Sequence, residues 1–260
     1  MSDMNPYQPP KSGAVSTASA AAGNLIAGGR AVEAGQGWEW IASGFALFKK
    51  APGTWILMLI VWLVCLILVA VVPIIGGLAN MVLWQIFMGG AMVGCRALDR
   101  GEELEVGHVL AGFKENTSNL VVVGLLALVA WMIVLIPAFV MLGGGGFMAV
   151  MQGGGVAAFA ALGLTFVLVM LVVLALTIPI YMALWFAPAL IVFHNLTAVE
   201  SMKTSFAACL KNIVPFLLYS VILLLLAMVA SIPFGLGWLI LLPVVVASIY
   251  TAYRDIFLAA

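Results

Sequence analysis

Long apolar runs alternate with short polar segments along this chain, and the charged residues stand in the polar segments. Residues 51–95, 116–199 and 212–253 contain no Asp, Glu, Lys or Arg, which gives uncharged runs of 45, 84 and 42 residues. One helical crossing of a bilayer needs roughly 20 apolar residues, so each run has room for a helical hairpin. The pattern predicts six transmembrane helices, near residues 54–75, 77–97, 119–142, 156–187, 213–232 and 236–257.

The polar segment before each hairpin has a periodicity of its own. Its repeated positions are Trp38, Ile41, Phe45 and Phe48 in the first segment, Val106, Val109, Phe113 and Asn116 in the second, and Val199, Met202, Phe206 and Cys209 in the third. Because an α-helix brings positions with this spacing to one face, each segment is predicted to form an amphipathic helix. Such a helix would lie on the cytoplasmic membrane surface with its apolar side toward the lipid. Thr197 and Glu200 have the spacing of a capping box at the start of the third helix.

These elements predict an all-α, polytopic membrane protein with six transmembrane helices in three hairpins, each preceded by an interfacial helix. The transmembrane domain spans 37–258, and 37–98, 105–190 and 197–257 are candidate internal repeats. Many amphipathic helices share such spacing, so three unrelated segments are the alternative. Residues 1–36 are rich in Pro, Ser, Ala and Gly, and they lack the basic start and compact apolar core of a signal peptide. They are predicted to form a disordered cytoplasmic tail.

Composition agrees with this pattern, and charge adds an orientation. The chain is 65% hydrophobic and 8% charged, whereas soluble domains carry about a quarter charged residues. The formal net charge is zero, which gives no basis for binding nucleic acid. None of the ten Lys and Arg residues stands in the connection within a predicted hairpin. By the positive-inside rule, both termini are therefore expected in the cytoplasm.

The longest uncharged run contains the glycine-rich stretch "GGGGFMAVMQGGG" at 143–155. A Walker-type phosphate loop ends in Gly-Lys followed by Ser or Thr, and this stretch has no Lys. The stretch is therefore predicted to form an extracytoplasmic turn between two crossings.

The interiors of the predicted crossings contain no charged residues and few polar ones. A charge at the centre of a membrane helix costs about 2.5–3.5 kcal/mol, so it is kept where function needs it. The absence of such charges argues against a proton relay, a voltage sensor or a carboxylate-based catalyst inside the membrane. Four polar residues are candidates to line a cavity, and hydrogen bonding between helices is the alternative role for them. They are Asn80, Gln85, Thr177 and Tyr181.

The sequence predicts no catalytic, cofactor or metal site. His108 and His194 have no partner at a metal-ligand spacing, and the three cysteines form no C-x-x-C pair. The motifs of serine hydrolases, zinc proteases and dinucleotide-binding proteins are absent. An enzyme would require that the fold gather the two histidines with the acidic run at 102–105.

Contact with membrane lipid is the interaction that the sequence predicts most directly. Aromatic rings favour headgroup depth, and Lys or Arg side chains reach lipid phosphates. The candidate residues are Trp38, Trp40, Lys49, Lys50, Lys203, Lys211, Tyr253 and Arg254. Arg254 is expected to contact either a lipid phosphate or an acidic residue such as Glu200.

Three stretches resemble a known group of proteins. They are "GWEWIASGFALFKKAPGTWI" at 37–56, "WFAPALIVFHNLTAVESMKTSFAACLKNIVPFLLY" at 185–219 and "PVVVASIYTAYRDIF" at 243–257. They resemble an uncharacterised group of proteobacterial inner-membrane proteins, which is similar to the membrane-anchor region of bacterial glycerophosphodiester phosphodiesterases. The matching residues are Pro188, Ala198, Ser201, Ser205, Phe206, Tyr250, Tyr253, Arg254 and Asp255. The resemblance implies a bacterial inner membrane, and it brings no activity with it because the group is uncharacterised. The soluble catalytic domain of the phosphodiesterases has no counterpart in these 260 residues, so their activity is not inferred.

These observations favour a non-enzymatic scaffold, assembly factor or lipid-interacting accessory protein. Its expected partners are membrane lipids, together with another membrane protein or a second copy of the chain. The alternative is a channel or permease for a lipid or an apolar small molecule. The candidate repeats and the prolines within the crossings speak for that alternative.

Overall fold

The computed structural model describes residues 25–151, 153 and 155–259. In this part of the chain the regular elements are nine α-helices and one 3-10 helix. They are α2 (Gln36–Lys50), α3 (Pro52–Ala70), α4 (Ile75–Asp99), the 3-10 helix η1 (Val106–Phe113), α5 (Thr117–Met151), α6 (Val156–Leu184), α7 (Ala187–His194), α8 (Ala198–Lys211), α9 (Ile213–Ser231) and α10 (Trp238–Phe257). The fold is therefore all-α, as predicted.

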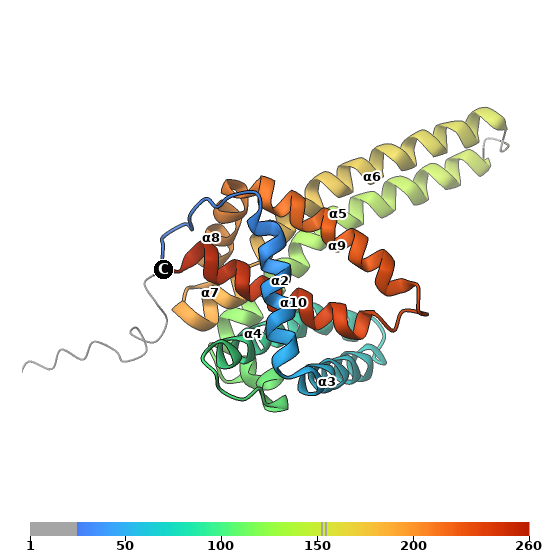
Figure 1. Ribbon diagram of the computed structural model, residues 1–260. Helices are drawn as coiled ribbons and strands as arrows, with labels where there is room; N and C mark the ends of the chain where they lie inside the picture. Colours follow the sequence, from blue (N-terminus) through green and yellow to red (C-terminus); the bar gives the residue numbers. More distant parts are fainter. Residues whose placement is uncertain (1–24, 152, 154, 260) are drawn as a thin grey trace, which may run out of the picture.

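Six long apolar helical spans, long enough to cross a membrane, correspond to the six predicted crossings. They pair as the hairpins α3–α4, α5–α6 and α9–α10, and α7 continues the span of α6. The connections within the hairpins point to one side of the molecule (Figure 1). The opposite side, which we call the charged end, carries the segments between the hairpins and the C-terminus of α10. The predicted polytopic membrane fold is confirmed.

The α5–α6 hairpin projects beyond the other helices (Figure 1). Helix α5 continues through 143–146 to Met151, so the prediction that the whole stretch 143–155 forms a turn is wrong for residues 143–151. An apolar surrounding offers the backbone no hydrogen-bond partners, and a helix satisfies its own N–H and C=O groups. Gly153, at a φ of +88°, stands in the connection itself, where a residue without a Cβ is favoured.

The three segments before the hairpins differ in structure. Helices α2 and α8 form as predicted, and Thr197 and Glu200 make the predicted capping box at the start of α8. The second segment forms the 3-10 helix η1, so the α-helix predicted there is wrong. This segment packs closely against the backbone of α4: a Cβ on Gly112 would lie 1.9 Å from the carbonyl oxygen of Ile86. A 3-10 helix is common in such short connecting segments.

The apolar face of α2 is covered by protein. Helix α2 crosses α10 (Figure 1), and the two backbones approach so closely that a Cβ on Gly44 would lie 2.7 Å from the backbone nitrogen of Ser248. Trp40, Ile41 and Phe48 are buried in this contact region. The prediction that α2 turns its apolar side toward the lipid is therefore wrong for these residues.

Residues 25–35 are also ordered, which corrects the predicted extent of the tail. The backbone nitrogens of Ile26 and Arg30 donate hydrogen bonds to the carbonyl oxygens of Phe257 and Ile256, at 2.8 and 2.9 Å. Lys211 donates from Nζ to the carbonyl oxygen of Gly29 at 3.0 Å. The segment is thus tied to α10 and α8. The rest of the predicted tail lies outside the described residues.

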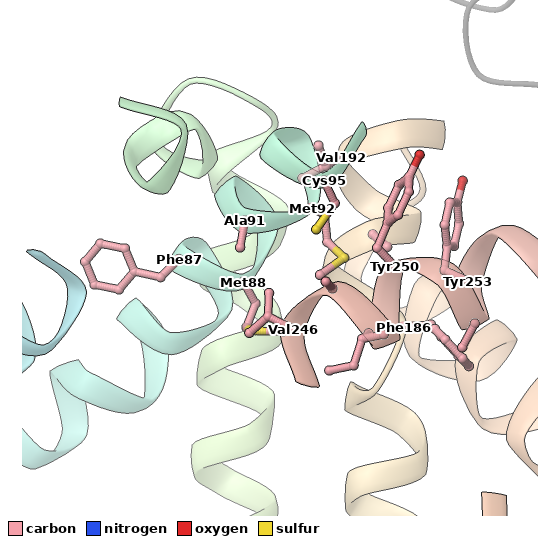
Figure 2. Close-up of a cluster of buried hydrophobic side chains, with 14 of the residues drawn as sticks. Phe87, Met88, Ala91, Met92, Cys95, Phe186, Val192, Val246, Tyr250 and Tyr253 are labelled. Atoms are coloured by element: carbon pink, nitrogen blue, oxygen red, sulfur yellow. The ribbon is translucent and has the colours of Figure 1, made fainter. Parts of the chain in front are cut away.

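The most deeply buried side chains gather near the charged end. Figure 2 shows side chains of α4 facing those of α10, with Phe186 and Val192 from the α7 region beside them. Cys95 on α4 and Ile256 on α10 have no exposed surface. This core holds together the ends of helices that are distant in sequence, and it supports the polar groups described next.

Candidate functional site

Four polar side chains on the C-terminal turns of α10 contact different parts of the molecule. They are Tyr250, Tyr253, Arg254 and Asp255. Tyr250 donates a hydrogen bond from its hydroxyl to Oδ2 of Asp99 at 3.1 Å, and Arg254 forms an ion pair with the same carboxylate. The hydroxyl of Tyr253 lies 2.6 Å from Nε2 of His194, at the end of α7. The motif YTAYRD at 250–255 therefore joins α10 to α4 and α7.

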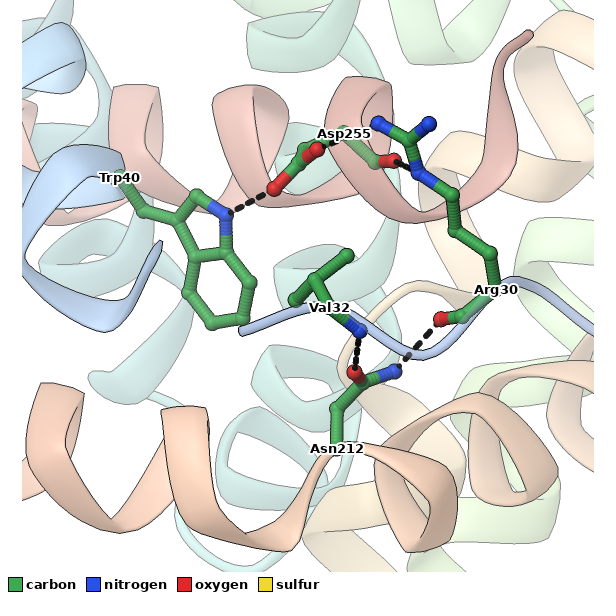
Figure 3. A network of polar contacts seen from close by, with 5 residues as sticks. All are labelled: Arg30, Val32, Trp40, Asn212 and Asp255. Atoms are coloured by element: carbon green, nitrogen blue, oxygen red, sulfur yellow. Dashed lines mark hydrogen bonds and ion pairs between the residues drawn. The ribbon is translucent and has the colours of Figure 1, made fainter. Parts of the chain in front are cut away.

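Asp255, the last residue of this motif, binds the N-terminal part of the described chain. Its Oδ1 forms an ion pair with Nη2 of Arg30 at 2.7 Å, and its Oδ2 accepts a hydrogen bond from Nε1 of Trp40 at 3.0 Å. Figure 3 shows Asp255 between these two side chains. A single carboxylate thus fixes both α2 and the segment that precedes it against α10.

Asn212 holds the same segment from the other side. Its Oδ1 accepts from the backbone nitrogen of Val32 at 2.8 Å, and its Nδ2 donates to the carbonyl oxygen of Arg30 at 2.9 Å (Figure 3). Asn212 has no exposed surface. These paired bonds satisfy both polar atoms of a buried amide, which otherwise would cost free energy. The position of Arg30 is therefore set by Asp255 and Asn212 together.

A pocket of about 420 Å³ lies between α2 and α10 beside this network. It is lined by Arg30, Gln36, Glu39, Trp40, Ser43, Thr251, Arg254, Asp255, Leu258 and Ala259. One wall is a polar face of α2, and the opposite wall is a face of the last two turns of α10. The pocket has the size of a small-molecule site, and two cationic and two anionic side chains line it.

The charged groups of the pocket differ in their partners. Arg30 and Arg254 are held by Asp255 and Asp99, yet their side chains remain 42% and 47% exposed. Glu39 is exposed and has no ion pair or hydrogen bond from its carboxylate among the described residues. The arrangement can therefore bind a ligand through charge. It contains no nucleophile paired with a base, so it does not suggest catalysis.

The two histidines of the enzyme hypothesis have different partners in the structure. His108 completes a capping box in η1, where its Nδ1 accepts from the backbone nitrogen of Glu105 at 3.0 Å. His194 instead contacts Tyr253. Over the described ranges, no group of three or more His, Cys, Asp or Glu side chains could hold a metal ion.

The predicted lipid-contact residues fall into two groups. Trp38, Lys49 and Lys203 are exposed, and so are Lys50 and Lys211, although these two donate to backbone carbonyl oxygens of Leu98 and of Gly28 and Gly29. Their contact with lipid stays a prediction.

Two residues of that set are buried in protein. Trp40 is 2% exposed and Tyr253 is 1% exposed, so their assignment to lipid is wrong. Each polar tip has a protein partner, Asp255 and His194, and each ring packs among other aromatic rings. Arg254 pairs with Asp99 in place of the expected Glu200.

The four candidate cavity residues do not line the pocket. Asn80 donates to the carbonyl oxygen of Leu66, which is a contact within the α3–α4 hairpin. Gln85 is 5% exposed inside the protein, whereas Tyr181 on α6 is 52% exposed and packs its ring against Trp131. Thr177 is partly exposed on α6. The hydrogen bond of Asn80 is of the helix-to-helix kind that the sequence left as the alternative.

Sequence reasoning missed Asp99, Arg30 and Asn212, which organise the site. Arg30 and Asp255 are 225 residues apart, and Arg254 and Asp99 are 155 apart. No local pattern joins such pairs. The one signal was that Asp99 follows one predicted crossing by two residues and Asp255 stands in the last turn of another, each beside a basic residue of the same segment.

A probable inner membrane protein of Burkholderia thailandensis is 28% identical to this chain over 213 residues, which cover 79% of this chain and 78% of that protein. No family model and no solved structure matches the chain. Together with the six apolar spans, this relative supports a multi-pass protein of a bacterial inner membrane. Nothing in these comparisons supports the resemblance to phosphodiesterase anchors.

Proposed function

We propose that this chain is a non-enzymatic, lipid-interacting accessory protein of the inner membrane. The observation that carries the proposal is the pocket between α2 and α10, which places two half-exposed arginines at the charged end of the transmembrane helices. In a membrane, this level is where helix ends meet lipid headgroups. Arginine binds phosphate through several N–H donors at once.

The network around the pocket fits binding better than turnover. Both arginines are oriented by carboxylates, and the backbone of the pocket walls is held by Trp40, Asn212 and Asp255. A preorganised site binds with a smaller loss of conformational entropy. The structure thus offers a fixed polar surface where a headgroup can dock.

The channel or permease alternative has no comparable support. Its candidate residues lie on α4 and α6 and do not share the pocket. A scaffold that binds another membrane protein stays compatible with the exposed α5–α6 hairpin, and the following experiment separates it from lipid binding.

The test is native mass spectrometry of the protein extracted gently from its own membrane, followed by thermal unfolding after removal and return of lipid. We expect bound lipid in the spectrum, and we expect returned lipid to raise Tm because it binds the folded state. If no lipid is retained and Tm does not respond, the proposal is wrong. A second protein at fixed stoichiometry would then support the scaffold.

A further inference from the structure

We infer that the pocket between α2 and α10 binds a phospholipid headgroup that carries both a phosphate and a primary ammonium group. Arg30 and Arg254 face the phosphate, and Glu39 faces the ammonium. This inference rests on the proposed lipid-interacting function and names the lipid class. The chemistry is that of a phosphoethanolamine headgroup, as in phosphatidylethanolamine.

The phosphate end follows from the two arginines. Arg30 and Arg254 enter the pocket from different parts of the chain, and both stay about half exposed after pairing with Asp255 and Asp99. A guanidinium has five N–H donors in a rigid fork, so one carboxylate leaves donors for a second anion. The pairing also holds each guanidinium in place, which favours bidentate contact with phosphate oxygens.

The ammonium end follows from Glu39. Glu39 lines the wall that α2 contributes, together with Gln36 and Ser43 at helical spacing. Among the described residues it is the pocket's carboxylate without a cationic partner, since Asp255 pairs with Arg30. A primary ammonium has three donors for such an acceptor, whereas a quaternary ammonium has none. Glu39 therefore favours ethanolamine over choline.

The balance of charge distinguishes this headgroup from anionic ones. Two arginines and two acidic side chains line the pocket. An anionic headgroup such as phosphatidylglycerol would satisfy the arginines and leave Glu39 unpaired near a second negative charge. A zwitterion matches both signs, which is the basis of electrostatic selectivity.

The position of the pocket favours a lipid over a soluble phosphoester. Exposed aromatic residues stand on α2 near the pocket-lining positions: Trp38 is 51% exposed and Phe45 is 43% exposed. Aromatic side chains of this kind favour the membrane–water interface. The pocket also lies at the C-terminal end of the candidate membrane span Trp238–Phe257, at the charged end.

The test compares headgroups on identical acyl chains. Delipidated protein is placed in phosphatidylcholine nanodiscs that contain equal mole fractions of either phosphatidylethanolamine or phosphatidylglycerol, and retained lipid is counted by native mass spectrometry. We expect wild type to retain phosphatidylethanolamine about tenfold over phosphatidylcholine, because a charge-assisted hydrogen bond is gained. Glu39→Gln should abolish this preference and leave the Tm of the delipidated protein unchanged, since Glu39 is exposed and unpaired.

The matched control is Glu103→Gln. Glu103 is an exposed acid on the connection between α4 and η1, at the same end of the molecule but outside the pocket. It should keep the wild-type preference for phosphatidylethanolamine. This control separates a specific contact of Glu39 from a general change of surface charge.

Four outcomes would overturn the inference. Retention of lipid without headgroup preference, or a preference that survives Glu39→Gln, would disprove the assignment while the proposed function stands. A rise in Tm with free phosphoethanolamine but not with phosphatidylethanolamine nanodiscs would identify a soluble ligand. Failure to retain any lipid would remove the proposed function as well.

Discussion

The α4–α10 core and the α5–α6 hairpin are both built from helices long and apolar enough to cross a membrane, yet the protein uses them in opposite ways. Over a window of 18 residues, 67% of the span Trp238–Phe257 in α10 is buried inside the protein, and only 6% of the span Leu162–His194, which contains most of α6, is buried. The buried helix is the less apolar of the two, with Ser248, Tyr250 and Thr251 on it, whereas α6 is rich in exposed Leu, Val and Met. Lipid tails are as apolar as leucine, so apolarity does not drive a membrane helix into the core.

What buries α10 is close approach and hydrogen bonding. Gly44 allows the backbones of α2 and α10 to touch, and Thr251 donates from Oγ1 to the carbonyl oxygen of Trp40 at 2.9 Å. The buried hydroxyls of Tyr219 and Ser248 lie 2.7 Å apart. Close backbone contacts and polar side chains thus accompany the large apolar side chains of the interior, whereas the exposed surface of the α5–α6 hairpin is almost entirely apolar.

The strongest test of this contrast exchanges glycine for alanine in both regions. Gly44→Ala places a methyl group against the backbone of α10, and we expect a loss of about 1–3 kcal/mol, as for other overpacked sites. Gly143→Ala lies in open space on α5, and we expect no loss or a gain of up to about 1 kcal/mol from helix propensity. Thermal unfolding in one detergent measures both. Equal effects of the two changes would break the contrast.

The next test removes a polar contact of the core. Asp99→Asn takes the charged acceptor from Arg254 and Tyr250. We expect a loss of about 1–3 kcal/mol, because hydrogen bonds to a charged group are stronger than neutral ones. Chemical unfolding provides the measurement, and Glu103→Gln serves as the control for lost surface charge. An unchanged stability would mean that the pairing of Arg254 contributes little.

Thiol labelling compares the accessibility of the buried hydrophobic cluster, to which Cys209 belongs, with that of the hairpin tip. Burial raises the pKa of Cys209 on α8 to about 12, so at pH 8 its thiolate fraction is on the order of one in ten thousand. We expect Cys209 to resist maleimide until the protein unfolds. Val156→Cys, at a position that is 88% exposed at the tip of the hairpin, should react at once.

The same variant tests the orientation that the basic residues predict. A membrane-impermeant maleimide should label Val156→Cys from the extracytoplasmic side, since the tip carries none of the Lys and Arg residues. Labelling that requires permeable cells would show the reverse orientation. Wild type, with its three native cysteines, gives the background for this assay.

The smallest expected effect is at Tyr181. Its side chain is 52% exposed on α6 and packs by its ring against Trp131 at a centroid distance of 5.7 Å. Tyr181→Phe keeps the ring and removes only the hydroxyl. The free energy of unfolding should therefore change by no more than about 0.5 kcal/mol, and Tm should be nearly unchanged. A large effect on stability or on membrane permeability would revive the cavity role of this residue.

Much of the fold follows from sequence alone, because its causes are local. The length of the charge-free runs requires helices that satisfy their own backbone groups, and Thr197 with Glu200 begins α8 by a bond spanning three residues. The proposed repeat of three units stays a prediction. The α-helical spacing of the second segment failed because packing of η1 against α4 outweighed a weak local preference.

The sequence by itself determined that the chain crosses a membrane six times and where its charges stand, since transfer into lipid depends on each segment alone. Only the tertiary structure decided which helices are interior and how the pocket is built. Asp255 meets Arg30 and Trp40, and Asp99 meets Arg254, across 155 to 225 residues of chain. These contacts depend on how the helices pack in space, and closeness in the sequence does not predict them.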